Sequence, residues 1–232
     1  QANAIPTFGY LQLRHALDDL HQEKNVRAII LTGSGNVFSA GTDLKQLNTE
    51  LQREAQASHQ DIELLNELLL AMLRFPKPII AALNGPAIGS AAALALACDF
   101  VIAAKQATLQ LSEVKLGLAP GSAVTMLNFR AGAAIATRYS ITGEPLSAEV
   151  GLQMGLIHDV VEEDLVWARA HQLVLEIEST SSQSIQMTKR LLNESLADQL
   201  ETQLQVSGAM TAAARTTSHA NVGISAFLRK ET

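Results

Sequence analysis

Apolar residues recur at two different spacings near the start of the chain. Four of them lie three or four positions apart, as on one face of a helix: Tyr10, Leu13, Leu17 and Leu20. Residues 26–32 (VRAIILT) are then a continuous β-prone run that ends at Gly33. The pattern predicts a helix followed by a buried strand.

The same alternation continues through the middle of the chain. Apolar residues at helical spacing in 62–73 predict a second helix, which Pro76 and Pro78 end. Residues 79–83 and 99–104 are short apolar runs of strand length. Between these two strands we expect a turn and then a helix over 89–97, whose small side chains allow close packing.

Fully apolar strands that alternate with helices are typical of parallel strands covered on both faces, so we predict an α/β fold. After Ser122 the pattern is mostly helical, with one short strand expected over 156–161. We predict an α/β core over residues 1–162 and a helical C-terminal region over 163–232.

Composition narrows the class of protein. The chain has 232 residues, is 47% hydrophobic and carries a net charge of −6, which excludes intrinsic disorder and argues against nucleic acid as a partner. A single cysteine, Cys98, rules out an internal disulfide and a Cys-based metal site, and we expect it in the core. With no signal peptide visible, a cytoplasmic location is expected.

The apolar stretch over 79–104 resembles a membrane span at first sight. Polar and turn residues interrupt it, among them Asn84, Gly85 and Asp99, so no run reaches the roughly 18 residues that a span needs. We therefore predict no contact with a membrane.

Candidate chemistry lies in two glycine turns that each follow a predicted strand, 38–45 and 84–90. The carboxyl ends of parallel strands meet at one edge of a sheet, so backbone N–H groups near Thr42 and Ser90 would converge on one oxygen. Such a pair of donors suits an enolate or another oxyanion. Ordinary tight turns with glycine at positive φ are the alternative. We find no metal-binding motif, and the histidines are scattered.

Four segments occur in an order that resembles the crotonase superfamily, the enoyl-CoA hydratase/isomerase proteins. They are SAGTDLK at 39–45, KPIIAALNGPAIG at 77–89, ACD at 97–99 and LGLAPG at 116–121. The resemblance implies a crotonase-like β-β-α superhelix whose helical C-terminal region builds a homotrimer or hexamer. It also implies that a coenzyme A thioester is the substrate, with no further cofactor.

The resemblance also implies roles for individual residues. Thr42 and Ser90 match the two residues whose backbone N–H groups form the family's oxyanion hole. Ala40, Asp43 and Lys45 match the region that receives coenzyme A, although Lys45 is also compatible with a solvated helix position. Family members usually have two further strands before the segment that matches residues 1–4, so we expect the chain to lack them.

The catalytic acids depart from the hydratase pattern. Hydratases of this family use two glutamates; the first position here is Ala93, and the second is Glu113. Some isomerases place an acid where this chain has Gly121. The lone Glu113 is similar to the mitochondrial type of Δ3-Δ2-enoyl-CoA isomerase, and moving a proton from C2 to C4 needs only one carboxylate. Glu113 could instead be a surface carboxylate paired with Lys115.

We therefore predict an isomerase that converts a 3-enoyl-CoA to a 2-enoyl-CoA, with Glu113 as its base. The alternatives are a hydratase that uses one glutamate, whose hydration Ala93→Glu would raise, and a non-catalytic acyl-CoA-binding homologue. A decarboxylase or a ring-processing hydrolase is a further possibility. The expected lining of the acyl pocket is apolar: Leu44, Leu47, Met72, Leu116, Val124 and Leu127.

Overall fold

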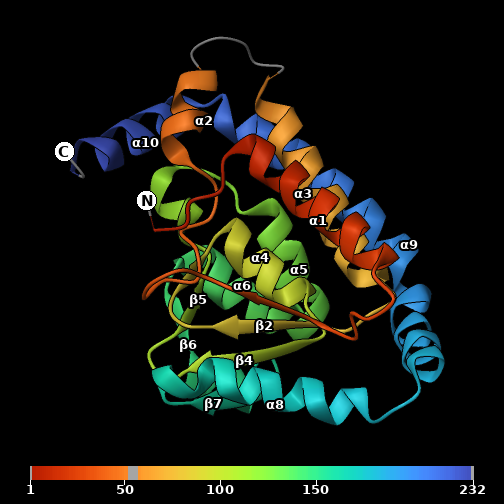
Figure 1. Cartoon of the computed structure of the whole chain (residues 1–232). Coiled ribbons are helices and arrows are strands. Elements are labelled where there is room, and N and C mark those ends of the chain that lie inside the picture. The colour runs from red at the N-terminus through yellow and green to blue at the C-terminus, as the bar shows by residue number, and fades with distance from the viewer. Residues whose placement is uncertain (1, 52–56, 231–232) are drawn as a thin grey trace.

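The computed structural model describes residues 2–51 and 57–230, and these form a layered α/β structure (Figure 1). The main sheet has strand order β1-β2-β4-β7, and every neighbouring pair in it is parallel. Its strands are β1 (Ile29–Thr32), β2 (Ile79–Leu83), β4 (Phe100–Ala104) and β7 (Asp159–Val161). The predicted parallel α/β arrangement is confirmed, with the first and last strands three residues shorter than the sequence pattern indicated.

A second, smaller sheet was not predicted. Its strands are β3 (Ala87–Ile88), β5 (Thr108–Gln110) and β6 (Pro145–Ser147). β3 pairs with β5 in parallel, and β5 pairs with β6 antiparallel. These strands are two or three residues long, which is too short for their side chains to show a period in the sequence.

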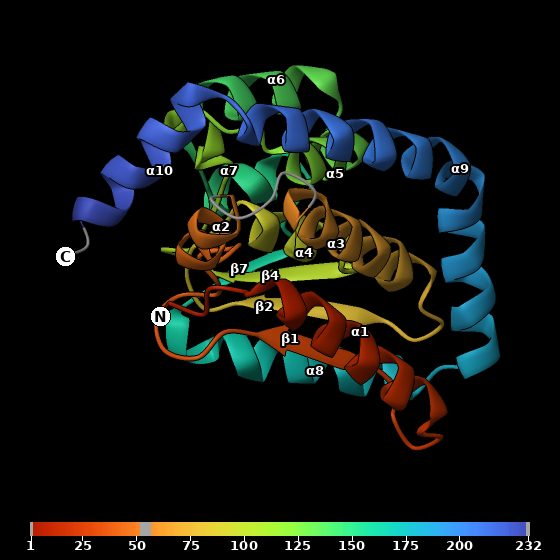
Figure 2. The ribbon, with the colours of Figure 1, turned by 90° about the horizontal axis from the view of Figure 1, so that it is seen from above.

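Helices cover both faces of the main sheet, with α8 on one side and α1, α3 and α4 on the other (Figures 1 and 2). The first half of the chain contributes α1 (Thr7–Gln22), α2 (Leu44–Leu51), α3 (Ala57–Arg74) and α4 (Ser90–Ala97). The second half contributes α5 (Gly121–Ala131), α6 (Ala133–Thr142), α7 (Ala148–Gln153), α8 (Val166–Glu178), α9 (Ser182–Arg215) and α10 (Ser218–Lys230). Two 3₁₀ turns are η1 (Ser112–Leu116) and η2 (Glu163–Leu165).

Small side chains let α4 lie at the centre of the molecule. All eight of its residues are buried, five of them alanines, so the helix can approach its neighbours closely. Cys98, which follows the helix, is also buried, as expected, and burial raises the pKa of its thiol. The helix begins at Ser90, and its first N–H groups therefore open toward the end of the sheet where the candidate turns lie.

The long helix α9 crosses the outer side of α3 and α5 and is held by buried polar contacts. Lys189 donates to the Asp99 carboxylate at 2.6 Å, and Arg215 makes a bidentate ion pair with Asp61 at 2.6 and 2.8 Å. Asn66 of α3 donates to the carbonyl of Leu204 at 2.9 Å. These contacts tie the C-terminal helices to the core.

The described helices include none that is long and apolar enough to cross a bilayer. Likewise, the described His, Cys, Asp and Glu residues form no group of three that could hold a metal ion.

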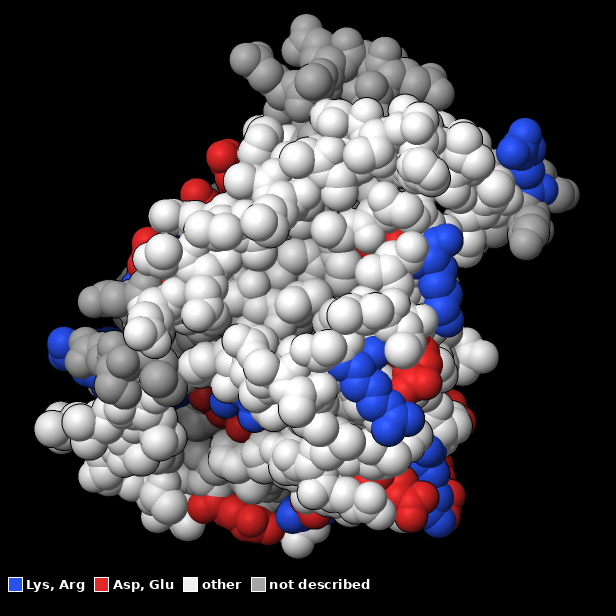
Figure 3. Space-filling view, turned by 180° about the vertical axis from the view of Figure 1, so that it is seen from behind, with Lys and Arg blue, Asp and Glu red and all other residues white. Residues whose placement is uncertain are grey.

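On the face opposite to the view of Figure 1, Lys and Arg side chains are interspersed with Asp and Glu (Figure 3).

Candidate active site

The two glycine turns lie directly against each other. The N–H of Ile88 donates to the carbonyl of Ser39 at 3.0 Å, and Gly41 and Gly89 have φ values of +80° and +58°. A Cβ on Gly41 would lie 2.3 Å from the carbonyl oxygen of Ile88. Glycine is therefore needed at Gly41 both for the backbone conformation and for the close approach of the second turn.

The backbone N–H of Thr42 points away from Ile5, the residue that pairs with it. Ile5 donates to the carbonyl of Gly41 at 2.7 Å, and Asp43 donates to the carbonyl of Ile5 at 2.9 Å. Because these parallel-type bonds come from the residues on either side of Thr42, its own N–H points to the opposite side. Ser90 is the first residue of α4, so its N–H has no partner within the helix.

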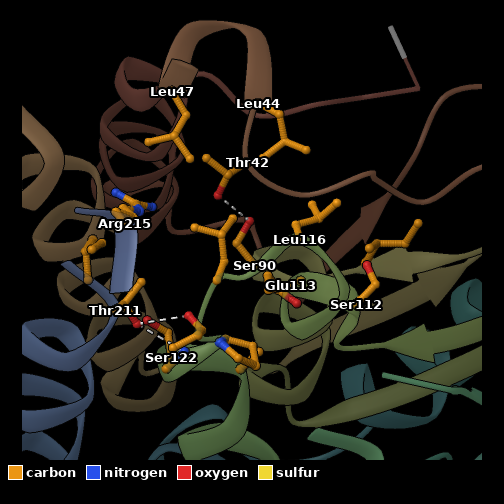
Figure 4. Close-up of a pocket in the computed structure, with 18 of the residues that line it drawn as sticks. Thr42, Leu44, Leu47, Ser90, Ser112, Glu113, Leu116, Ser122, Thr211 and Arg215 are labelled. Carbon is orange, nitrogen blue, oxygen red and sulfur yellow. Dashed lines mark hydrogen bonds between the residues drawn. The ribbon is translucent and has the colours of Figure 1, made fainter. Parts of the chain in front are cut away.

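The side chains of Thr42 and Ser90 meet in the cavity wall. Their hydroxyl oxygens are 3.2 Å apart and hydrogen-bonded (Figure 4). The hydroxyl of Tyr10 lies 2.9 Å from Thr42 Oγ1 and donates to Ser90 Oγ at 2.8 Å. Burial raises the pKa of Tyr10 to about 12, so this phenol stays protonated at neutral pH. The sequence pattern indicated Tyr10 only as one apolar position of a helix face.

Glu113 faces the same cavity from η1 (Figure 4). Its Oε2 is buried, and no described residue hydrogen-bonds to it. A Cβ on Gly89 would lie 2.4 Å from its Oε1, so the carboxylate occupies the space that this glycine leaves. Burial raises the pKa of Glu113 to about 7. The alternative of a surface carboxylate paired with Lys115 does not describe this position.

The cavity has a volume of about 310 Å³ and is lined by both apolar and polar side chains. Leu44, Leu47 and Leu116 line it, as predicted. For three other residues the prediction that they line the cavity was wrong. Met72 and Leu127 are buried in the core, and Val124 lines a separate hollow between α5, α6 and α9. Helical spacing identifies the buried face of a helix, but part of that face packs on the core and only part reaches the cavity.

A polar group also lines the cavity, and no pattern in the sequence indicated it. It comprises the Asp61–Arg215 ion pair, Ser122 and Thr211. Asp61 and Arg215 are only 2% and 5% exposed and 154 positions apart in the chain. Charged residues in two separate helical segments give no signal of pairing, so only the fold could bring them together.

The residues expected to receive coenzyme A lie within three positions of Thr42 in the chain. Ala40 lines the cavity, and the side chain of Asp43 accepts hydrogen bonds from the N–H groups of Lys45 and Gln46 at 2.9 and 3.2 Å. Asp43 therefore caps α2. Lys45 is exposed on the first turn of α2. Their contact with coenzyme A stays a prediction.

Ala93, the position at which hydratases of the resembled family carry their first glutamate, is fully buried in α4. It is not among the residues that line the cavity. Asp61 is the other carboxylate among the described lining residues, and it is engaged by Arg215. The arrangement can therefore present one carboxylate oxygen without a partner, two backbone N–H groups and an apolar wall to a ligand.

Known proteins resemble this chain over nearly its whole length. The family model described as enoyl-CoA hydratase/isomerase matches residues 1–232. The chain is 33% identical to the 1,2-epoxyphenylacetyl-CoA isomerase of Escherichia coli, over 95% of this chain and 85% of that protein. It is 31% identical to the 2,3-dehydroadipyl-CoA hydratase of the same organism, over 99% and 89%. A crystal structure of an enoyl-CoA hydratase/isomerase from Mycobacterium paratuberculosis superposes with a TM-score of 0.89 at 26% identity, covering 97% of this chain and 90% of that one.

Proposed function

The chain belongs to the enoyl-CoA hydratase/isomerase family of acyl-CoA enzymes, and we propose that within this family it is an isomerase that converts a 3-enoyl-CoA to a 2-enoyl-CoA. The observation that carries the proposal is the carboxylate of Glu113, whose Oε2 is buried without a hydrogen-bond partner and which faces the same cavity as Thr42 and Ser90. A buried carboxylate oxygen without a hydrogen-bond partner costs stability, and a group of this kind in a cavity is a candidate for function.

The proposed reaction moves one proton. Glu113 takes a proton from C2, and the electron pair of that C–H bond is delocalised onto the thioester oxygen, which forms an enolate. The backbone N–H groups of Thr42 and Ser90 hold this oxygen, and loss of one such donor typically costs about 3 kcal/mol of transition-state stabilisation. Glu113 then returns the proton to C4, while the double bond moves from C3–C4 to C2–C3.

The protonation equilibrium of Glu113 suits this shuttle. A pKa of about 7 lets the carboxylate accept the proton at neutral pH and give it back in the next step. The apolar wall around Leu44, Leu47 and Leu116 suits a hydrocarbon part of the acyl group. The reaction needs no group besides these residues and the coenzyme A thioester of the substrate.

A hydratase that uses one glutamate is the second candidate, and the 31% identity to the 2,3-dehydroadipyl-CoA hydratase favours it. Hydration requires a water to be activated while a proton reaches carbon, which two carboxylates do well. Position 93 is an alanine, buried in the core, and the carboxylate of Asp61 is held by Arg215. Neither position therefore supplies a second carboxylate to the substrate. This favours the isomerase over the hydratase.

The test compares a 3-enoyl-CoA and a 2-enoyl-CoA of equal chain length with the purified protein, by the ultraviolet absorbance of the conjugated thioester. We expect absorbance to rise with the first substrate and to change little with the second. Rapid loss of absorbance with the second substrate would instead establish the hydratase. Tight binding of both without turnover would point to an acyl-CoA-binding homologue.

We further propose that the protein assembles as a homotrimer or hexamer and works in the cytoplasm. Large apolar side chains exposed on α9 support assembly, among them Met187, Leu191 and Met210, which are 67%, 77% and 66% exposed. Analytical ultracentrifugation tests the assembly; a monomer at micromolar concentration would contradict it.

We also propose that Lys45 contributes to the binding of coenzyme A. Lys45→Ala is expected to weaken the affinity for coenzyme A, and an unchanged affinity would show that Lys45 is not part of the site.

A further inference from the structure

Three hydroxyl groups form one hydrogen-bonded cluster behind the proposed oxyanion hole: those of Tyr10, Thr42 and Ser90. Their oxygens are 2.8, 2.9 and 3.2 Å apart in the three pairs. Tyr10 lies on α1 and is 0% exposed, so the hydroxyls of Thr42 and Ser90 are what its own hydroxyl contacts. The cluster therefore joins three segments that are 32 to 80 positions apart in the chain.

Core packing alone does not account for the hydroxyl of Tyr10. Phenylalanine would fill the same space, and burying a phenol is unfavourable unless its hydroxyl is bonded. An oxyanion hole built from backbone N–H groups makes no demand for a hydroxyl side chain at either of its residues. Here both residues carry one, and the phenol bonds to both.

The contact adds a side-chain link to the backbone hydrogen bond by which the N–H of Ile88 joins the second turn to the carbonyl of Ser39. Thr42 belongs to the turn after β1, and Ser90 begins α4 after the second turn. The N–H groups of these two residues must reach one oxygen together, and small errors in such positions reduce rates strongly. A fully buried phenol between the two side chains holds the turns in register.

We propose that Tyr10 is a positioning residue of the reaction, which acts through the hydroxyls of Thr42 and Ser90 to set the spacing of their backbone N–H groups. This inference rests on the proposed function in one respect, namely that these N–H groups bind the thioester oxygen. It adds a residue that is not among those lining the cavity.

The first experiment is Tyr10→Phe, which keeps the ring and removes the hydroxyl. We expect kcat to fall about tenfold with little change in KM, because both donors remain but lose part of their alignment. Tyr139→Phe is the matched control, since Tyr139 is the other tyrosine of the chain, is also buried and does not line the cavity. It should leave kcat unchanged.

A double-mutant cycle separates positioning from general stability. In a background of Thr42→Val and Ser90→Ala, the hydroxyl of Tyr10 has lost both of its contacts. Adding Tyr10→Phe there should cause no further loss of kcat. A further tenfold loss in that background would overturn the proposal, because Tyr10 would then act by another route.

A spectroscopic measurement keeps the test independent of turnover. An enoyl-CoA with an aromatic chromophore, such as cinnamoyl-CoA, shifts its absorption band when the thioester carbonyl is polarised on binding. Tyr10→Phe should reduce this shift at saturating ligand, and Tyr139→Phe should not. If the protein binds this thioester but isomerises no 3-enoyl-CoA, the proposed isomerase function is wrong. The shift of the absorption band then still tests the positioning role of Tyr10. An unchanged band and unchanged kcat in Tyr10→Phe would overturn the inference, even if the melting temperature fell.

Discussion

Replacing Glu113 with glutamine should make the protein more stable at alkaline pH while it removes activity. The carboxyl is buried without a partner for Oε2, and its pKa is raised from 4.5 to about 7. The folded protein therefore holds this proton more tightly than the unfolded chain does. A difference of this size corresponds to about 3 kcal/mol.

The sign follows from the direction of the pKa. The stabilising contribution is complete below pH 4.5, falls as pH rises toward 7, and is absent above that. Glutamine carries no titratable proton, so the variant does not lose this contribution. The difference in unfolding free energy between Glu113→Gln and the original protein should grow by about 3 kcal/mol between pH 4.5 and pH 8.

Thermal melts of both proteins from pH 4.5 to 9 measure this difference. For a chain of this length, about 3 kcal/mol corresponds to a difference of roughly 6 to 12 °C in melting temperature. Glu149→Gln is the matched control: Glu149 is exposed on α7, so its variant should show no pH-dependent difference of this size. A melting difference for Glu113→Gln that stays constant over this range would refute the argument.

Activity supplies the second half of the same prediction. kcat/KM of the original protein should rise with pH through an inflection near pH 7, because the proposed base must be ionised. Glu113→Gln should lower turnover by about 10²- to 10⁴-fold and leave coenzyme A binding largely intact. Retained activity in this variant would exclude Glu113 as the base.

Two further predictions concern the walls of the cavity. Gly89→Ala would place a Cβ 2.4 Å from Oε1 of Glu113 at a φ of +58°, so turnover should fall far more than in Gly35→Ala, where φ is +74° but nothing lies within 4 Å; equal losses would contradict this. Arg215→Met should destabilise the fold by about 3 to 5 kcal/mol in chemical denaturation, because Asp61 stays buried without its ion pair. Adding Asp61→Leu should recover most of that loss, and no recovery would mean that packing rather than charge is responsible.

The sequence alone determined the parts of the fold that repeat over a few residues. Apolar runs over 79–83 and 99–104 predicted buried parallel strands, and the alanine-rich segment predicted the tightly packed helix α4. The glycine turns, together with a resemblance spread over four segments, selected Thr42, Ser90 and Glu113. The structure places all three around one cavity.

Only the tertiary structure decided the chemistry of that cavity. Period and motif describe neighbours in the chain, whereas the Asp61–Arg215 pair and the hydroxyl cluster of Tyr10 join residues far apart in sequence. The raised pKa of Glu113 likewise depends on the tertiary structure. Its sequence context is also compatible with a surface carboxylate, and its pKa is raised because the folded chain removes water from it without supplying a partner for Oε2. Desolvation is a property of the packed molecule, so no local pattern encodes it.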